Sequence, residues 1–281
     1  MRRELFLYDN SPQSSSIFLD CSQQFVANET EILRCVVDTL QHTQEQQGKA
    51  TKQHLLVVAG AMIFFMQTGF AMLCAGSVRL KNVQNTMLKN LLDACGSALA
   101  FFLVGYGLAF GGQSNTALTT FVGTEDFCTV GPSAAYWFFQ YTFSATSVTI
   151  IAGTLAERCQ MAAYLLYSVF MTGFVYPVVA HSLWSPNGFL SSSNVDAFLG
   201  VGAIDFAGAG VVHLSGGTVA LFASIILGPR RGRFYDEQGD PLAVPKPFPG
   251  HSVSLQLLGT LVLWFGCKLQ RRFPADSSIA A

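Results

Sequence analysis

The sequence predicts an all-α fold, a polytopic bundle of transmembrane helices. Of its 281 residues, 51% are hydrophobic and only 12% are charged, whereas a soluble domain carries charge at about 25% of its positions. So few charges cannot cover the surface of a soluble domain of this size. Apolar stretches long enough to span a bilayer as helices also recur along the chain. The net charge of −1 by itself indicates nothing about nucleic acid. The sequence shows no basic face that could neutralise phosphates, so we exclude nucleic acid as a partner.

Residues 1–52 form a polar tail rich in Gln and Ser. The tail contains no apolar run of the roughly 7 to 15 residues that a signal peptide requires, so we expect it to be retained. A glycosylation sequon begins at Asn28, which fits a tail on the outer side of a membrane. Cys21 and Cys35 lie in the same tail, and the sequence leaves open whether they form a disulfide or remain free thiols.

Six apolar stretches follow, and we expect five transmembrane spans and a partial sixth. The stretches are 55–74, 91–110, 134–155, 162–183, 206–227 and 253–269. Each of the first five is long enough to cross a bilayer, while the sixth is at the lower length limit. The third is interrupted by Gln140 and by several threonines and serines, a pattern typical of a helix packed inside a bundle rather than one facing lipid.

Lysine and arginine are confined to alternate loops between these stretches. The first, third and fifth loops hold all eight, and loops 111–133 and 184–205 hold none. Because cytoplasmic loops collect positive charge, this pattern predicts an N-terminal tail outside the cell. Lys268, Arg271 and Arg272 follow the sixth stretch and would also lie outside. Their charge indicates either an incomplete sixth span or an abnormal C-terminal end.

Two ionisable residues lie in or beside the fifth stretch. His213 is in its middle, where an ionisable side chain is costly, so it is a candidate residue of a polar pathway. The alternative is a histidine bonded to a neighbouring carbonyl inside the bundle. Asp205, just before the apolar run, either caps the helix N-terminus or attracts a cation to a vestibule.

Aromatic residues mark the third and fourth stretches. Trp184, at the outer end of the fourth, is either an anchor at the headgroup level or a ring that binds a small cation over its face. Phe143 lies one turn beyond Phe139 on the third stretch, near Gln140, and its residue type alone indicates packing. The usual catalytic motifs and metal-ligand spacings are absent, so we expect neither an enzyme nor a cofactor or metal site.

Several segments resemble the ammonium transporters of the Amt/Mep/Rh family, and the pattern is closest to plant and algal members. The segments are GFAMLCAGSVRLKN at 69–82, FFQYTFSATSVTIIAGTLAER at 138–158, TGFVYPVVAHSLW at 172–184, AIDFAGAGVVHLSGG at 203–217 and GPRRGRF at 228–234. The resemblance covers residues 54 to about 266, and we assign 53–266 as a partial ammonium transporter transmembrane region.

The resemblance implies a fold, a location and partners. Family members have five helices, a second inverted set of five and one more helix, assembled as a trimer in the plasma membrane with a pore in each protomer. This chain would then be the first inverted repeat, with ammonium or ammonia as its substrate and the lipid bilayer around it. Its protein partners would be further copies in a homotrimer or full-length subunits in a hetero-assembly.

The resemblance also implies residue roles. Phe143 matches the first of two stacked gate phenylalanines, and Trp184 matches the aromatic residue of the external ammonium site. Asp205 matches the carboxylate that supports this site, and His213 the first of the twin histidines. Gln140, near Phe143, is expected to line the same pore.

The resemblance stops abruptly after the string LGTLVLWFG at 258–266. Residues 267–281 form a divergent C-terminal tail, and the second gate phenylalanine, the serine of the external site and the second histidine do not follow. A frameshift, a retained intron or a shortened gene model would produce such a tail. Two hypotheses remain: the chain is a truncated form or fragment of an ammonium transporter, or it is a non-conducting half-subunit that associates with and modulates full-length transporters.

Overall fold

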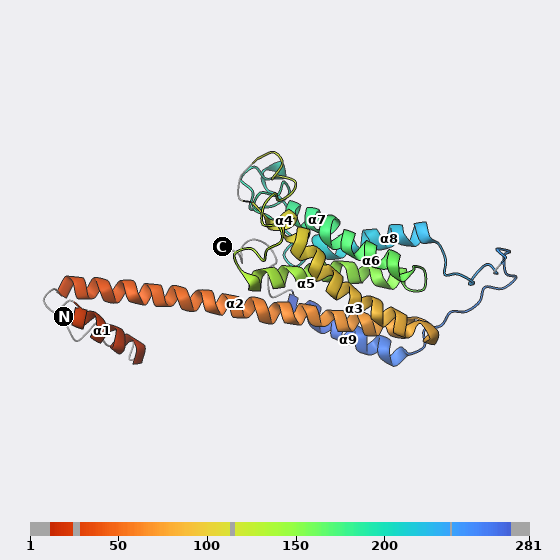
Figure 1. Cartoon of the computed structure of the whole chain (residues 1–281), viewed down its shortest axis with the longest axis horizontal. Coiled ribbons are helices and arrows are strands. Elements are labelled where there is room, and N and C mark those ends of the chain that lie inside the picture. Colours follow the sequence, from red (N-terminus) through yellow and green to blue (C-terminus); the bar gives the residue numbers. More distant parts are fainter. Residues whose placement is uncertain (1–11, 25–28, 113–115, 237, 271–281) are drawn as a thin grey trace. The chain divides into compact units, whose positions relative to one another are not determined.

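The structure, a computed structural model, describes residues 12–24, 29–112, 116–236 and 238–270. The chain divides into two compact units, Met1–Leu55 and Leu56–Ala281. All regular elements among the described residues are helical (Figure 1). In chain order they are α1 (Pro12–Gln24), α2 (Glu29–Ser77), η1 (Leu80–Asn82), α3 (Val83–Ala100), η2 (Phe101–Gly105), α4 (Tyr106–Phe110), α5 (Ala134–Leu155), α6 (Met161–Phe170), η3 (Met171–Val175), α7 (Tyr176–Trp184), η4 (Phe198–Gly200), η5 (Ala209–Leu214), α8 (Ser215–Leu227) and α9 (Val253–Gln270).

The first unit contains α1 and the first part of α2, so much of the polar tail is helical. The structure joins Cys21 and Cys35 by a disulfide, which settles the pairing that the sequence left open. A cross-link of this kind limits the conformations open to the unfolded tail. Asn28 lies outside the described residues, so its glycosylation stays a prediction.

Among the residues that the structure describes, four helices are long and apolar enough to cross a membrane. Their bounds are Glu29–Ser77, Leu80–Phe110, Met161–Trp184 and Ala209–Leu227. A shorter apolar helix, Val253–Lys268, corresponds to the partial sixth span. These helices fall on five of the six stretches that the sequence predicts, so the prediction of a helical membrane bundle is confirmed.

The second span begins earlier than its apolar stretch. The sequence places Lys89 in the first loop, but the structure places it in α3, with only 4% of its surface exposed. Its ammonium group donates to the backbone carbonyl of Cys159, 2.6 Å away, in the connection between α5 and α6. Because a lysine stem is long and apolar, Lys89 can lie within the helix while its charged end reaches a polar loop. The first loop is therefore shorter than predicted.

The remaining stretch, α5, is the polar-threaded helix and packs against α3 and α8. Its threonine and serine side chains are buried, as the sequence pattern predicted. Four of them donate to carbonyls one turn earlier, for example Thr142 to Phe139 at 2.6 Å and Thr146 to Thr142 at 2.7 Å; the others are Ser147 and Thr149. Because these bonds satisfy most of the hydroxyl groups within the helix, α5 can be both polar in composition and buried.

Glycines let α9 approach α2 closely. A Cβ atom on Gly69 would lie 3.0 Å from the carbonyl oxygen of Gly259, and one on Gly259 would lie 2.5 Å from the backbone nitrogen of Leu73. At Gly76, a Cβ would lie 2.6 Å from the carbonyl oxygen of Ser252. Backbones in contact at small residues are the usual geometry of tightly packed membrane helices.

Three π-helical turns interrupt the spans. They are η2, η3 and η5, and each continues directly into an α-helix. The first two lie against each other, since a Cβ on Gly105 would come within 2.5 Å of the carbonyl oxygen of Thr172. Such turns are uncommon and occur often at functional sites. In this chain the third carries His213.

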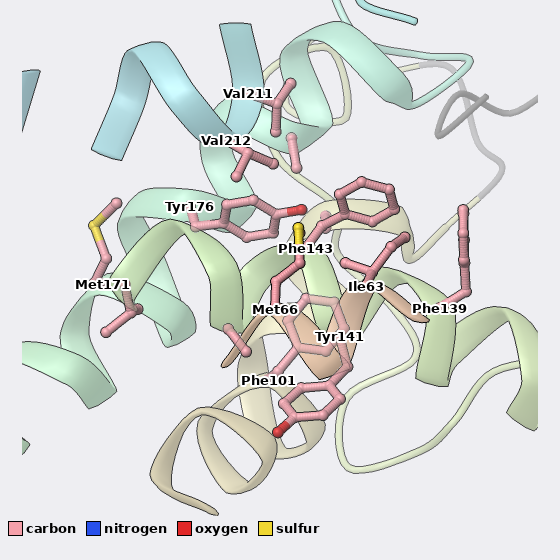
Figure 2. Close-up of a cluster of buried hydrophobic side chains, with 14 of the residues drawn as sticks. Ile63, Met66, Phe101, Phe139, Tyr141, Phe143, Met171, Tyr176, Val211 and Val212 are labelled. Carbon is pink, nitrogen blue, oxygen red and sulfur yellow. The ribbon is translucent and has the colours of Figure 1, made fainter. Parts of the chain in front are cut away.

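The hydrophobic core of the second unit is built around α5. Figure 2 shows Phe139, Tyr141 and Phe143 of α5 among residues from the neighbouring helices, including Ile63 of α2 and Val212 of η5. Phe139 and Phe143 have no exposed surface. The core therefore brings together helices that are distant in sequence, and it fixes the position of the rings discussed next.

Candidate functional site

Aromatic rings of α5 and α7 meet at one end of α7. The rings of Phe143 and Trp184 meet edge to face at an interplanar angle of 70°, with centroids 5.4 Å apart, and the ring of Phe139 packs edge-on against Phe143 at 5.0 Å. Edge-to-face geometry places the positive edge of one ring against the negative face of another. Trp184 is fully buried at the end of its helix, so it is a packed part of this cluster.

Asp205 connects this aromatic cluster to the helix that follows. Its backbone carbonyl accepts a hydrogen bond from the Trp184 indole nitrogen at 2.7 Å. Its carboxylate oxygen Oδ2 accepts from the backbone N–H groups of Gly210 at 3.0 Å and Val211 at 2.7 Å. The N-cap residue of η5 is Gly208, and the Asp205 carboxylate caps the turn from further upstream by accepting from two N–H groups of its first turn, as one of the two roles that the sequence allowed.

His213 lies on the opposite side of η5 from the core. Its neighbours Val211 and Val212 are fully buried, whereas the His213 side chain is exposed. The ring makes no hydrogen bond to another residue in the described part of the chain, so it differs from the carbonyl-bonded histidine that was the alternative. The backbone nitrogen of His213 donates to the carbonyl of Gly208 at 3.0 Å, as the π-helical turn requires.

Gln140 is buried inside the bundle on α5. Its amide nitrogen donates to the hydroxyl of Tyr136, 3.0 Å away and one turn earlier on the same helix. The structure therefore brings Trp184, Phe143 and Asp205 into one cluster. Gln140 lies in the interior of the bundle, on the same helix as Phe143 and three residues before it. His213 lies on an exposed helix face.

A buried histidine lies next to Trp184 in the structure. The two ring nitrogens of His181 are 2.9 Å from the carbonyl oxygen of Ala109 and 2.7 Å from that of Thr119. A ring nitrogen that carries a proton donates to the carbonyl oxygen that it faces. His181 thus connects α7 to α4 and to the segment that follows α4. The sequence shows that His181 is three residues before Trp184, but it does not show which two carbonyl groups His181 contacts.

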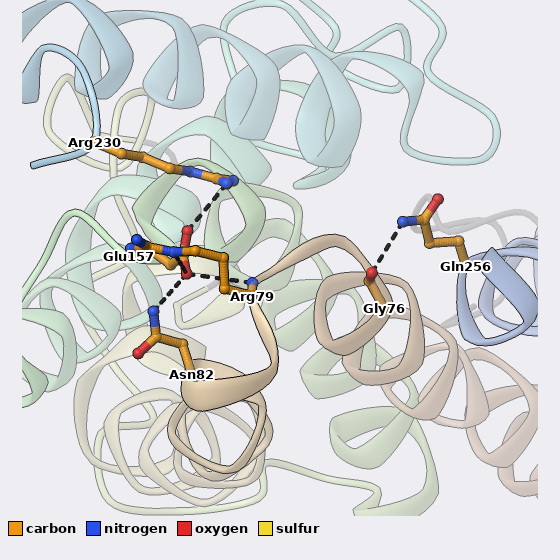
Figure 3. A network of polar contacts seen from close by, with 6 residues as sticks. All are labelled: Gly76, Arg79, Asn82, Glu157, Arg230 and Gln256. Carbon is orange, nitrogen blue, oxygen red and sulfur yellow. Dashed lines mark hydrogen bonds and ion pairs between the residues drawn. The ribbon is translucent and has the colours of Figure 1, made fainter. Parts of the chain in front are cut away.

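A second polar cluster joins three loops at the other end of α5. Figure 3 shows Arg79, Asn82 and Arg230 around the carboxylate of Glu157, and we refer to these four residues as the Glu157 node. Arg79 Nε donates to Glu157 Oε1 at 2.9 Å, Asn82 donates to the same oxygen, and Arg230 lies 3.1 Å from Oε2. Only 1% of the Glu157 side chain is exposed.

The electrostatics of the Glu157 node favour an ionised carboxylate. Burial by itself would raise the pKa of Glu157. The hydrogen bonds from Asn82 and Arg79 and the charges of Arg79 and Arg230 outweigh burial, so the pKa lies below its ordinary value. Local sequence does not reveal this arrangement, because Arg79 and Asn82 lie 78 and 75 positions before Glu157 and Arg230 lies 73 positions after it.

A buried carboxyl group also lies between α3 and α6. Asp93 has no exposed surface and accepts a hydrogen bond from the hydroxyl of Tyr164. Lys89, one turn earlier, lies over the Tyr164 ring at 5.1 Å. The sequence contains one feature from which this contact could have been predicted, an aspartate inside the apolar stretch 91–110. Charged residues within a span usually mark a polar contact or a functional site.

No group of three or more His, Cys, Asp or Glu side chains in the described ranges is placed to hold a metal ion. The chemistry of the site is therefore that of ring faces, backbone carbonyls and one capping carboxylate. A bundle of apolar helices around a buried polar helix defines a multi-pass membrane protein. The chain belongs to the ammonium transporter family: the sequence model described as Ammonium Transporter Family matches residues 54–267.

Relatives from plants and archaea support this assignment. Ammonium transporter 1 member 3 of Solanum lycopersicum is 46% identical over 211 residues, which are 75% of this chain and 45% of the relative. Ammonium transporter Amt2 of Archaeoglobus fulgidus is 45% identical over 215 residues, 75% of this chain and 44% of the relative. The chain thus spans about half the length of these curated relatives.

Solved structures of the family have the same arrangement of helices. A structure titled Sensor Amt Protein superposes with a TM-score of 0.63 and 31% identity, and it covers 82% of this chain and 56% of the other. The crystal structure of Saccharomyces cerevisiae Mep2 gives a TM-score of 0.63 with 25% identity, covering 78% of this chain and 48% of Mep2.

Proposed function

We propose that this chain contributes one wall of the pore of an ammonium transporter in the plasma membrane, with its N-terminal tail outside. The observation that carries the proposal is the contact of Trp184 with both Phe143 and Asp205. These three residues, which the family resemblance assigns to an external ammonium site and its gate, form one cluster although they come from three different segments.

The chemistry of the cluster suits recognition of a small cation. An aromatic face attracts ammonium through cation–π contact, by roughly 0.5 to 2 kcal/mol. Such a site discriminates only weakly by size against similar cations. The bond to the Asp205 carbonyl orients the indole, and the cap on η5 fixes Asp205 in turn. Asp205 supports the site by position as well as by charge.

Passage beyond Phe143 is the step at which the charge becomes costly. The ring is fully buried among apolar side chains, so a cation at that depth would lose its hydration, at a cost of several kcal/mol or more. Removal of a proton before transit is the expected solution. His213, in the π-helical turn that begins its span, is the residue of this chain that we expect to line the path further in.

The exposed position of His213 indicates that a further segment or subunit is needed to complete the pore. A histidine and the neighbouring Gly217 and Thr218 are exposed on a membrane-spanning helix, and polar groups facing hydrocarbon are unfavourable. We therefore propose that another segment or subunit covers this face. A homotrimer and a hetero-assembly with full-length subunits both supply such a cover.

The experiment is growth of yeast lacking its own ammonium transporters on low ammonium. A chimera that continues residues 1–266 of this chain with the second half of the tomato relative should restore growth. The 281-residue chain expressed alone should not, because the His213 face is uncovered. Failure of a chimera that reaches the plasma membrane would contradict a transport function for this half. Robust growth with the chain alone would show that its helices close a pore by oligomerising.

A second candidate is a non-conducting half-subunit that modulates full-length transporters, and the exposed His213 face favours it as a docking surface. Co-expression of the chain with the tomato relative should then change methylammonium uptake at equal amounts of the relative. The chain should also co-purify with it. His213→Ala is the matched variant for this face, and unchanged uptake together with no co-purification would exclude the modulating role.

A further inference from the structure

A cavity of about 340 Å³ lies where α2 and α5 end. Its wall is formed mainly by apolar side chains from the last turns of the two helices. Lining residues include Phe70, Leu73, Cys74, Thr149, Ile150 and Arg230. Among the described residues that line the cavity, Arg230 alone is charged. The cavity is thus an apolar space with a guanidinium group in its wall.

The Glu157 node fixes that guanidinium group. Arg230 is held 3.1 Å from one carboxylate oxygen of Glu157, while Arg79 binds the other oxygen at 2.9 Å. Only 18% of the Arg230 side chain is exposed. Arg79 in turn lies over the ring of Phe248 at 3.7 Å, which ties the node to the loop before α9. Arg230 is therefore positioned by several contacts rather than free in solvent.

The charges at this end of the cavity do not cancel. Arginine side chains remain protonated at any physiological pH, and the node contains two arginines but one carboxylate. One positive charge is left over, beside a space with low-dielectric walls. Such walls extend the reach of a fixed charge, because the field is less screened than in water.

We propose that Arg230, held by Glu157 and Arg79, acts as a charge filter for this cavity, admitting neutral and anionic small molecules and repelling monovalent cations. The proposal rests on the proposed function in one respect only: in an ammonium transporter, the cavity would pass ammonia and repel ammonium. The filter itself is a property of the described residues, and it can be measured without transport.

Cys74 provides the measurement because its thiol is free and lies in the cavity wall. A thiolate attacks a methanethiosulfonate at the sulfenyl sulfur, forms a mixed disulfide and releases methanesulfinate. Three such reagents carry a trimethylammonium, a sulfonate or an uncharged methyl group. The thiolate fraction of Cys74 is common to all three reagents and drops out of the ratio of two rates. Asp93, which also acts on Cys74, is the same in every variant, so its effect drops out when that ratio is compared between variants.

The experiment uses the full chain in detergent, with the four other free cysteines replaced by serine. The replaced residues are Cys95, Cys128, Cys159 and Cys267. Mass spectrometry follows the modification of Cys74 by each reagent. Arg230→Gln should raise the ratio of cationic to anionic rate about fivefold, since one fixed charge at close range is removed. Arg230→Lys keeps the charge and should leave the ratio within about twofold of the unsubstituted chain.

Two further measurements test the charge filter even if Arg230→Gln folds poorly. Arg231→Gln removes an equal charge from the next, exposed position, and it should leave the ratio unchanged. Raising the salt concentration from about 0.01 to 1 M on the unsubstituted chain should raise the ratio, because screening weakens the filter. An equal effect of Arg231→Gln, a salt-independent ratio, or a Cys74 that resists even the neutral reagent would each overturn the proposal. The rates of Cys74 modification do not depend on transport. If the chimera fails to transport, the proposed function fails, and the charge filter is still tested by these rates.

Discussion

The indole nitrogen of Trp184 donates to the backbone carbonyl of Asp205 across 2.7 Å, while the Asp205 carboxylate caps the turn that carries His213. A residue at the end of α7 is thereby coupled to the start of the next span through one intermediate residue. A change at Trp184 therefore affects both the aromatic cluster and the position of η5.

Replacing Trp184 should weaken recognition of the substrate. In the chimera with the tomato relative, Trp184→Leu removes a cation–π contact of roughly 0.5 to 2 kcal/mol, which corresponds to a loss of affinity of up to about thirtyfold. The measurement is the apparent affinity for methylammonium in uptake. Trp137→Leu is the control, because Trp137 is another indole of the same bundle, stacked on Tyr141 at 5.5 Å. An unchanged affinity in the Trp184 variant would count against the site.

Phe143→Ala, in contrast, should mainly change the maximal rate of uptake and leave the affinity close to that of the unsubstituted chimera. The ring lies beneath Trp184 in the core and has no exposed surface, so its removal widens the path beyond the recognition step. A change in affinity as large as that of Trp184→Leu would show that Phe143 belongs to the recognition site instead of the gate.

The topology predicts which loops reagents can reach from outside. Ser192 and Gln238 are both exposed, and they lie in the fourth and fifth loops between the spans. In intact cells, a membrane-impermeant maleimide should label Ser192→Cys and leave Gln238→Cys unlabelled until the membrane is opened. The reverse pattern would overturn the assignment of the N-terminal tail to the outside.

The Glu157 node should make stability depend on pH in the acidic range. Because the pKa of folded Glu157 lies below its ordinary value of about 4.3, its stabilising effect is complete above that value and is lost as the pH falls through the lowered pKa. At pH 7, Glu157→Gln should cost about 2 to 4 kcal/mol, since two guanidinium groups lose their counter-charge. Thermal unfolding in detergent measures this cost, which should shrink below pH 4.3 or so. Glu125→Gln, at an exposed position, is the control, and equal losses in both variants would contradict the role of the node.

The hydrogen bond from Tyr164 to Asp93 should couple α3 to α6. Tyr164→Phe and Asp93→Asn should each destabilise the bundle, and the double variant should cost less than the two single losses together. A coupling energy of about 0.5 to 1.5 kcal/mol is typical of such bonds between membrane helices. Unfolding midpoints of the four proteins of this cycle give the value. Strict additivity would show that the two side chains act independently.

The fold could largely be predicted from the sequence because a membrane span requires a long apolar stretch, which the local amino-acid composition shows directly. Stretches such as 134–155 reappear as helices with the same bounds. The ends of spans were less predictable, since Lys89 is basic in type but reaches out of its helix to a carbonyl from a different loop. Local hydropathy does not contain a hydrogen bond between residues 70 positions apart.

The contacts of the candidate site could not be predicted from the sequence. The family resemblance assigns Trp184, Phe143 and Asp205 to one site, and residue type alone indicated packing for Phe143. The structure brings the three residues together, and their roles stay predictions. Glu157 was missed as a central residue, because a carboxylate in a loop is usually solvated and only the fold reveals Arg79 and Arg230 around it. Pairing across long separations is the information that a single sequence lacks.

The glycine contacts between α2 and α9 have a consequence for the order in which the bundle is completed. Ribosomes deliver α2 to the membrane long before α9, so the face of α2 that carries Gly69 and Gly76 has no partner while the intervening spans are inserted. Docking of α9 then closes this face by backbone contact. An alanine at Gly259 would therefore act late in biogenesis, leaving the earlier spans assembled and the final helix undocked.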